Sequence, residues 1–406
     1  MNKPTILITA IALLVLSGGV TLPQAFAANP LRDWTAHTPI RVVSPSSSTP
    51  VGLTPSQIRH IYGFDLLSCS FSGTFGSTSL CGTGQTVAII DAFDDPGIES
   101  DLGTFSSQFA LPNCTTANGC FTKDTPQGPP RTNRGWALEI SLDVEWVHAI
   151  APGAKILLVE SATNSFTNLF GAVDFAASQM GVHQVSMSWG GGEFSTESSS
   201  DSHFKVSGVT FTASSGDGGN GIIYPSASPL VVSVGGTTLN LDSSGNLVSE
   251  TAWSGSGGGI SKDETEPSYQ TTYPIPATGG FRGNPDVSYN ADPSSGVAIF
   301  DSLGDMGFKN WIQVGGTSAG APQWAALFAI ANVGRTSPLG STSTTTPTNV
   351  ALYNIAKTAY ATNYRDIKSG TNGSCGTVCT AGTNYDFVTG LGSPLANNII
   401  ASLHKA

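Results

Sequence analysis

The sequence GGTSAGAP at residues 315–322, followed by the apolar run WAALFAI at residues 324–330, is the stretch around which the fold is organised. Pro322 is expected in the first turn of a helix, where proline is tolerated because the N–H that it lacks would have no partner. We therefore expect Ser318 at the mouth of a buried helix, where free N–H groups and the helix dipole stabilise developing negative charge. That position suits a nucleophile. A simple turn before a core helix is the alternative, because short motifs also match by chance.

Composition limits the classes of partner. The chain has 406 residues, with 17 Lys and Arg against 28 Asp and Glu, and a net charge of −11. So few basic residues, spread thinly, argue against nucleic acid or an anionic membrane as the partner. Few salt bridges would be lost in acid, which is compatible with work at low pH.

The N-terminus has the order of a secretory signal. Lys3 precedes an uncharged apolar run at residues 6–16, and Ala-Phe-Ala ends at Ala27. The run is too short to span a bilayer, so we expect a signal peptide at residues 1–27, cleavage after Ala27 and a secreted, extracellular protein. An uncleaved anchor is the alternative. Residues 28–53 are polar and rich in Ser, Thr and Pro, which predicts an extended leader or linker.

The six cysteines fit an oxidising compartment. Sequence alone leaves fifteen pairings open. Local pairing is the prediction, and the three pairs are Cys69 with Cys81, Cys114 with Cys120, and Cys375 with Cys379. No His lies among them at zinc-ligand spacing, which disfavours a metal site there.

Strands and helices alternate along the rest of the chain. Thr54 and Pro55 cap a short helix that opens the expected globular domain, residues 54–406. The predicted strands cover residues 86–90, 155–159, 185–188, 209–213 and 231–234, and the predicted helices cover residues 136–150 and 166–180. Alternation predicts an α/β fold with a mainly parallel sheet covered on both faces, and active groups at the carboxyl ends of the strands. Residues 255–292 are rich in Gly and Pro and are expected to form loops.

Two carboxylates lie four residues apart in the first of these helices, at Glu139 and Asp143, and so share a face. Like charges at that spacing are mildly destabilising. Either both point to water, or they share a proton, so that one raises the pKa of the other as a general base working in acid requires. Glu145 faces elsewhere. The sequence does not choose between the two interpretations.

Two further acids follow predicted strands. Asp217 lies in the Gly-lined turn Ser-Ser-Gly-Asp-Gly-Gly, and Asp91 ends the first strand. Each is either a loop cap or part of a site: a protonated Asp217 near Ser318 would donate a hydrogen bond to an oxyanion, and Asp91 would hold the helix carboxylates in place. No His has a suitable context, and His148 stands nine residues after Glu139. A Ser-His-Asp triad is therefore poorly supported.

Five ordered motifs together resemble the sedolisin, or serine-carboxyl, peptidases, relatives of kumamolisin. They are WALEISLDVEW at 136–146, APGA at 151–154, VSMSWG at 185–190, SGDG at 215–218 and GTSAGAP at 316–322. The resemblance implies a subtilisin-like three-layer fold and an endopeptidase active at acid pH. It also implies that Glu139 takes the proton of Ser318, Asp143 supports Glu139, and Asp217 stabilises the oxyanion. In the family, Asp91 and Trp189 would occupy supporting positions.

The C-terminal region resembles the family's calcium site. By that match Asp366 and Asp386 supply side-chain oxygens to one structural Ca²⁺, while Ile367, Gly382 and Asn384 supply carbonyl oxygens. The family normally has Gly where this chain has Asn384, and Trp where it has Tyr385. Asn reaches positive φ more easily than most residues, so a backbone ligand tolerates the change. An ordinary acidic loop is the alternative.

The chain departs from the family in one respect. Family members commonly carry a long folded pro-domain, whereas here the match begins about 26 residues after the predicted cleavage, so we expect none between them. We expect protein or peptide substrates, neither nucleic acid nor membrane as partner, and a monomer. The alternatives are a catalytically silent, calcium-stabilised binding domain and a conventional subtilisin-type peptidase, which lacks a suitably placed His.

Overall fold

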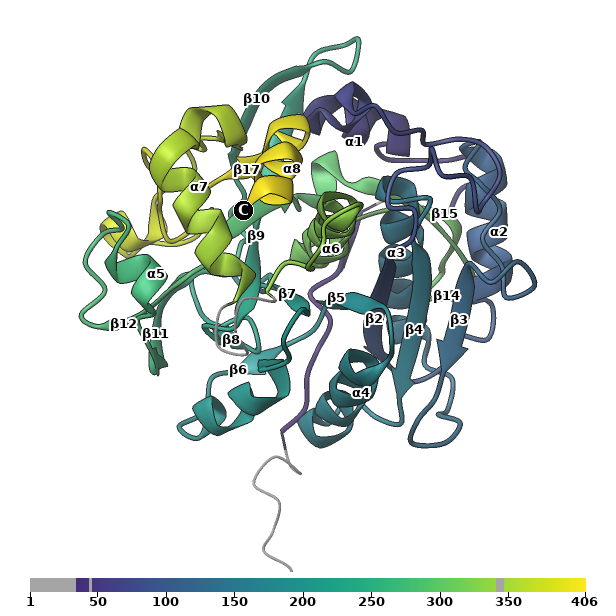
Figure 1. Ribbon diagram of the computed structural model, residues 1–406, viewed down its shortest axis with the longest axis horizontal. Helices are drawn as coiled ribbons and strands as arrows, with labels where there is room; N and C mark the ends of the chain where they lie inside the picture. The colour runs from purple at the N-terminus through teal and green to yellow at the C-terminus, as the bar shows by residue number, and fades with distance from the viewer. Residues whose placement is uncertain (1–33, 44–45, 341–346) are drawn as a thin grey trace, which may run out of the picture.

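A computed structural model describes residues 34–43, 46–340 and 347–406, so the predicted signal peptide lies outside the described residues. A central sheet runs through the molecule (Figure 1). Its strands, in spatial order, are β10 (Leu247–Ala252), β9 (Val231–Leu241), β7 (Thr210–Ser214), β5 (Val182–Met187), β2 (Thr86–Ala92), β4 (Lys155–Ser161) and β3 (Phe121–Asp124). β13 (Val287–Asn290) also pairs with β9. Among these pairings only β10 with β9 is antiparallel.

Helices cover both faces of the sheet. In β2, Val87 and Ile89 point into a core with α3 (Arg134–Ile150) and α6 (Gly320–Asn332), whereas Ala88 and Ile90 point into a second core with α4 (Phe166–Ser178). Alternate residues of a strand face opposite sides, so a strand buried on both faces is apolar throughout. The predicted α/β fold with a mainly parallel sheet is confirmed.

Local signals explain where these helices begin. Thr54 caps α1 (Pro55–Tyr62) in a reciprocal capping box with Gln57. Asn133 caps α3 by accepting from Trp136 N, and Ser165 caps α4 by accepting from Asn168 N. All three helices start within two residues of the predicted positions.

The loop prediction for residues 255–292 was wrong. The segment contains β11 (Gly259–Thr265), α5 (Ser268–Thr271), β12 (Phe281–Asn284) and β13. Its elements are short and separated by Gly and Pro, so no period accumulates along them. The remaining elements are β1 (Arg41–Val42), α2 (Ile98–Gln108), β6 (Gly191–Gly192), β8 (Ile223–Tyr224), β14 (Val297–Asp305), β15 (Phe308–Gly315), α7 (Thr348–Asn363), β16 (Tyr364–Arg365), β17 (Ser393–Pro394) and α8 (Ala396–Lys405), together with 3₁₀ turns at Phe64–Leu66, Glu197–Phe204, Pro293–Ser295, Thr317–Ala319 and Gly376–Cys379.

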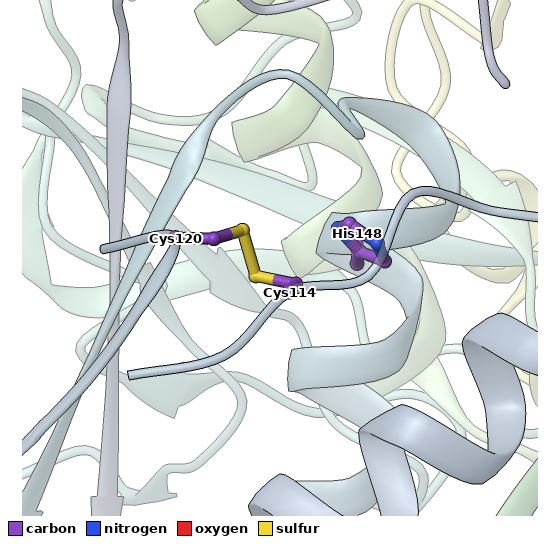
Figure 2. A group of neighbouring side chains, drawn as sticks. All are labelled: Cys114, Cys120 and His148. Carbon is purple, nitrogen blue, oxygen red and sulfur yellow. A yellow bond between two sulfur atoms is a disulfide. The ribbon is translucent and has the colours of Figure 1, made fainter. Parts of the chain in front are cut away.

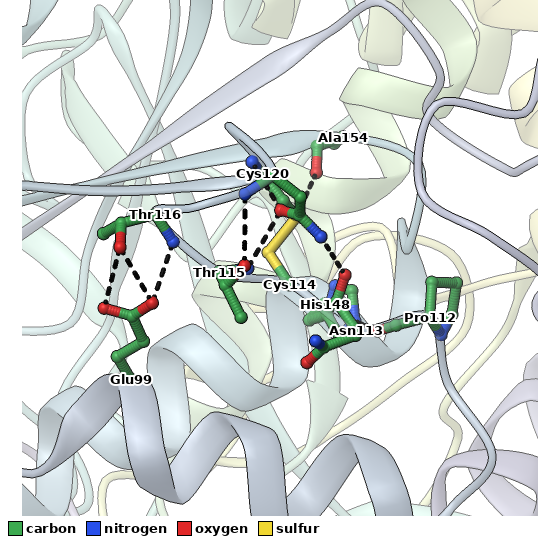
Figure 3. Close-up of a disulfide and its surroundings, with 10 residues drawn as sticks. Glu99, Pro112, Asn113, Cys114, Thr115, Thr116, Cys120, His148 and Ala154 are labelled. Carbon is green, nitrogen blue, oxygen red and sulfur yellow. Dashed lines mark hydrogen bonds between the residues drawn. A yellow bond between two sulfur atoms is a disulfide. The ribbon is translucent and has the colours of Figure 1, made fainter.

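Disulfides join the three predicted local pairs of cysteines. Cys114–Cys120 closes a turn between α2 and β3 (Figure 3). Glu99 of α2 accepts hydrogen bonds from the main-chain N–H and the hydroxyl of Thr116 in this turn. These hydrogen bonds hold the loop that the disulfide closes against α2. No helix within the described residues has the length and apolar character needed to cross a membrane.

Candidate active site

Ser318 lies in the 3₁₀ turn between β15 and α6, at the mouth of a fully buried helix as expected. Gly316 leads into the turn with φ of 111°, a conformation that favours glycine. A side chain at this position would collide with the carbonyl oxygen of Pro39 and with Asp217. The close approach of three chain segments therefore requires glycine at residue 316.

Glu139 and Asp143 face the Ser318 turn from α3, and both are fully buried. The interpretation in which both point to water is therefore wrong. Ser188, just after β5, donates from Oγ to Asp143 Oδ1 at 2.8 Å. Burial raises the pKa of both carboxyls well above the ordinary range, and Asp143 raises that of Glu139 further, whereas the hydroxyls of Ser318 and Thr38 act on Glu139 in the opposite direction. Such a pair holds protons at a pH where free carboxyls have lost them.

Asp91 joins this pair from the carboxyl end of β2. Its pKa is also raised, first by burial and then by Asp143 and Glu139. Neither of its oxygens has a hydrogen-bond partner among the described residues. Trp189 packs next to it, donating from Nε1 to the carbonyl of Ile90 at 2.8 Å. Asp91 thus stands beside the two helix carboxyls, and Trp189 is bound to the residue that precedes Asp91.

Asp217 approaches from the turn after β7. Its Oδ1 accepts from Thr317 N at 2.8 Å and from Thr317 Oγ1 at 3.0 Å, which fixes it against the turn that carries Ser318. Burial raises its pKa to about 7, although the Thr317 hydrogen bonds and the charge of Arg41 lower it. Near neutral pH and below, this carboxyl holds a proton that it can donate.

Part of the predicted leader also reaches the site, which the sequence did not indicate. Thr38 lies beside Glu139, and the Arg41 guanidinium donates to the main-chain oxygen of Asp217 at 3.0 Å. Arg41 Nε also lies 3.7 Å from Asp217 Oδ2. These leader residues line a cavity of about 350 Å³ together with the glycine-rich turns after β5 and β7. A larger cavity, between α7 and the C-terminus, contains none of the candidate catalytic residues.

His148 does not belong to this site. It is buried near Cys114 and Cys120 (Figure 2), and its Nε2 lies 2.7 Å from the carbonyl oxygen of Pro112. Burial lowers its pKa to about 4, so it stays neutral. The neighbouring sulfurs are joined in a disulfide and are not thiolates, the form of cysteine that binds metal. His148 and this disulfide therefore pack in the core and do not form a metal site.

The candidate calcium residues meet in one loop region near the C-terminus. Asp386 Oδ2 accepts from Gly382 N at 3.0 Å, and Asp366 Oδ1 accepts from Asn384 N at 2.9 Å. Asn384 has φ of 63°, the positive value that asparagine tolerates. Burial raises the pKa of Asp386 to about 6 against four hydrogen bonds that lower it. Ile367 is buried beside Asp366. Gly382 and Asn384 thus direct main-chain N–H groups at the two carboxyls, whose oxygens are hard donors of the kind that Ca²⁺ binds.

The structure also contains a second cluster of acidic side chains, which the sequence analysis did not identify. Carboxylate oxygens of Glu193, Glu197 and Asp263 lie within 4.8 Å of one another. They come from segments about 70 residues apart, so no spacing reveals them.

Comparisons with known proteins place the chain among its relatives. The model of the subtilase family matches residues 132–380. The chain is 30% identical to kumamolisin of Bacillus sp. (strain MN-32) over 88% of its own length and 64% of that protein's. It is 26% identical to sedolisin of Pseudomonas sp. (strain 101) over 86% of its length and 60% of that protein's. The chain thus spans somewhat less than two thirds of these relatives.

A solved structure of Pseudomonas sedolisin, a serine-carboxyl proteinase complexed with two molecules of pseudo-iodotyrostatin, superposes with a TM-score of 0.69 and 26% identity. The match covers 88% of this chain and 99% of that one. The chain therefore belongs to the subtilase family and, within it, to the sedolisin group.

Proposed function

We propose that the chain is a secreted serine-carboxyl endopeptidase that hydrolyses peptide bonds of proteins at acidic pH. The observation that carries this proposal is the convergence of the buried carboxyl side chains of Glu139, Asp143 and Asp217 on the turn that holds Ser318. Three buried acids around one hydroxyl have a large desolvation cost, and a purely structural role gives no reason to bear it. The relatives' names, which include sedolisin and kumamolisin, support the same activity.

The proposed reaction uses a carboxylate as the base. Glu139 takes the proton of Ser318 Oγ as that oxygen bonds to the substrate carbonyl carbon, and Asp143 orients Glu139 by sharing a proton with it. Protonated Asp217 donates a hydrogen bond to the oxyanion. Glu139 then returns the proton to the leaving amine as the C–N bond breaks, and water releases the acyl group by the same route.

The pKa of Asp217 gives this reaction an upper pH limit. The donor form of its carboxyl persists below about 7 and is lost as the pH rises through that value. We therefore expect activity to fall between about pH 6 and 8. A conventional subtilisin-type enzyme would instead gain activity over this range.

We also propose one structural Ca²⁺ at Asp366 and Asp386, with carbonyl oxygens from Ile367, Gly382 and Asn384. The bound ion would neutralise the two carboxyls and brace the loop between α7 and α8. Export through the predicted signal peptide agrees with the three disulfides. Protein or peptide substrates and a monomeric state complete the proposal.

Digestion of a denatured protein substrate at acid pH tests the activity. We expect the purified chain to digest it, and Ser318→Ala and Glu139→Ala to abolish digestion. Glu145→Gln is the matched control, because Glu145 lies on the same helix, is equally buried and instead accepts from Phe300 N. Robust hydrolysis by Glu139→Ala would sink the mechanism. A folded wild-type chain that digests nothing at any pH would favour the silent binding domain.

A further inference from the structure

Residues 34–42 cross the candidate active site as an extended strand. His37 exchanges two main-chain hydrogen bonds with Gly190, at 2.8 and 3.1 Å. On the other side, Ala36 N donates to Asn164 O at 2.8 Å, and Asn164 Nδ2 donates to Ala36 O at 2.8 Å. Main-chain bonds of this kind do not depend on side chains, so another peptide can make them in the same way.

The strand continues past the catalytic groups. After Thr38, beside Glu139, comes Pro39, whose carbonyl faces Gly316. β1 then pairs antiparallel with β15, with Arg41 opposite Gly315. The strand therefore enters on one side of Ser318 and leaves on the other, which is the path required of a peptide to be cut in its interior. The side chains of this strand therefore indicate where the side chains of a bound substrate would lie.

One side chain of this strand packs against a cluster of aromatic residues, which we call the aromatic wall. Trp34, three residues before His37, stacks on Phe194 with ring centroids 4.8 Å apart and planes at 30°. Phe194 in turn packs against Phe166, at 5.8 Å, and Tyr224, at 5.6 Å. Phe166 is fully buried, and its main-chain N donates to Trp34 O at 3.0 Å. The wall is therefore held in place from behind, and its backbone fixes the residue that stacks on it.

We propose that Phe194, supported from behind by Phe166, forms a distal subsite that binds an aromatic side chain of the substrate, three residues N-terminal to the residue that pairs with Gly190. This inference rests on the proposed peptidase function. Trp34 is 39% exposed, so its outer face lies open and the subsite accepts rings of different size. Offset stacking rewards an aromatic ring over an aliphatic side chain of similar area. The subsite thus favours substrates that carry an aromatic side chain at this position, which is far from the peptide bond that is cut.

Peptide kinetics on the full chain test the selection. The probe is an internally quenched peptide with the sequence of residues 34–41, compared with versions in which its first residue is Phe, Leu or Ala. We expect the Trp and Phe versions to exceed the Leu and Ala versions in kcat/KM by about three- to tenfold. The ratio should fall to about one in Phe194→Leu, which keeps an apolar side chain and removes the ring. Equal rates for all four peptides in the wild type would overturn the proposal.

Hydrogen exchange separates this subsite from catalysis. In the full chain carrying Ser318→Ala, which cannot cut its own leader, we expect Trp34→Leu and Phe194→Leu to speed exchange of the Ala36 and His37 amides by about three- to tenfold. Trp34→Phe should leave it unchanged, as should Val248→Ala on the exposed surface of β10. Protection independent of the ring would overturn the subsite even if the peptides are cut. Ring-dependent protection without any cleavage would support the subsite and contradict the peptidase function.

Discussion

The carboxyls around Ser318 and those of the C-terminal loop are the same chemical groups in contrasting surroundings. Glu139 has no hydrogen bond of ordinary geometry to either oxygen among the described residues, and Asp143 has one, from Ser188. Asp386 accepts from three main-chain N–H groups and one hydroxyl. Main-chain donors favour the charged form, whereas bare burial favours the neutral one. Burial therefore dominates the pKa values of Glu139 and Asp143, whereas at Asp386 the hydrogen-bond donors limit the rise that burial causes to about 6.

The largest effect should follow from breaking the proton-holding pair. Glu139→Gln keeps the size of the side chain but cannot take the Ser318 proton, so we expect kcat to fall by about 10²–10⁴-fold. Asp143→Asn should cost less, because it acts through Glu139. Assays at acid pH on a peptide substrate give both values, with Glu145→Gln as the control. If Asp143→Asn costs more than Glu139→Gln, the two roles are reversed.

The next effect concerns Asp217. Asp217→Ala removes the donor to the oxyanion, and we expect kcat to fall by about 10²–10³-fold with little change in KM. Asp217→Asn retains an N–H donor, so it should recover part of the loss and keep its activity above pH 7, where the wild-type carboxyl has lost its proton. Measurement of kcat from about pH 4 to 9 checks this. Identical pH profiles for the Asp217→Asn variant and the wild-type enzyme would contradict the assignment.

Removal of calcium should affect stability more than chemistry. If the Asp386 loop holds Ca²⁺, the ion stabilises the fold by about 2.7 kcal/mol at a concentration 100 times its Kd. We expect excess chelator at pH 7 to lower Tm by several degrees, and Asp386→Asn to remove that response. Asp242→Asn, in an exposed turn, is the control. Metal analysis that finds no calcium in active, stable protein would remove the proposal.

The smallest effect is the pH dependence of stability. The pKa of Asp217 is 3.8 ordinarily and about 7 in the folded protein. Its contribution to the free energy of unfolding is therefore fully present below pH 3.8 and is lost as the pH rises through 7. Glu139, Asp143 and Asp91 act in the same direction. His148 acts in the opposite direction, because its folded pKa of about 4 lies below 6.5 and its contribution is lost as the pH falls through 4. Chelator-treated protein should therefore have a higher Tm at pH 5 than at pH 7.5. A higher Tm at pH 7.5 would show that these acids are ionised in the fold.

Much of this arrangement could be predicted from the sequence. The composition of α3, the apolar side of α4 and the apolar runs of β2 and β4 reveal these elements, and the spacing of Glu139 and Asp143 places both on one helix face. Whether that face is buried depends on tertiary packing, which left two interpretations open. β12 and β13, with four residues each, are too short to establish a period. The roles of the site residues and the calcium ligands stay predictions.

The path of residues 34–42 could not be predicted for a different reason. Their partners Asn164, Gly190 and Gly315 bind through the backbone in most of the contacts, so the side-chain pattern of the leader carries no trace of them. Polar composition predicts an extended segment but does not indicate what that segment lies against.

The strand across the active site also has a consequence for concentration. Because it is covalently joined to the chain, it would compete with any dissolved peptide that binds the same cleft, at an effective concentration of roughly millimolar and whatever the amount of protein in solution. Dilution does not weaken such a competitor. Once the connection to the rest of the chain is cut, the same residues become an ordinary ligand that diffuses away. A single hydrolytic event would thus change the availability of the cleft for every later substrate.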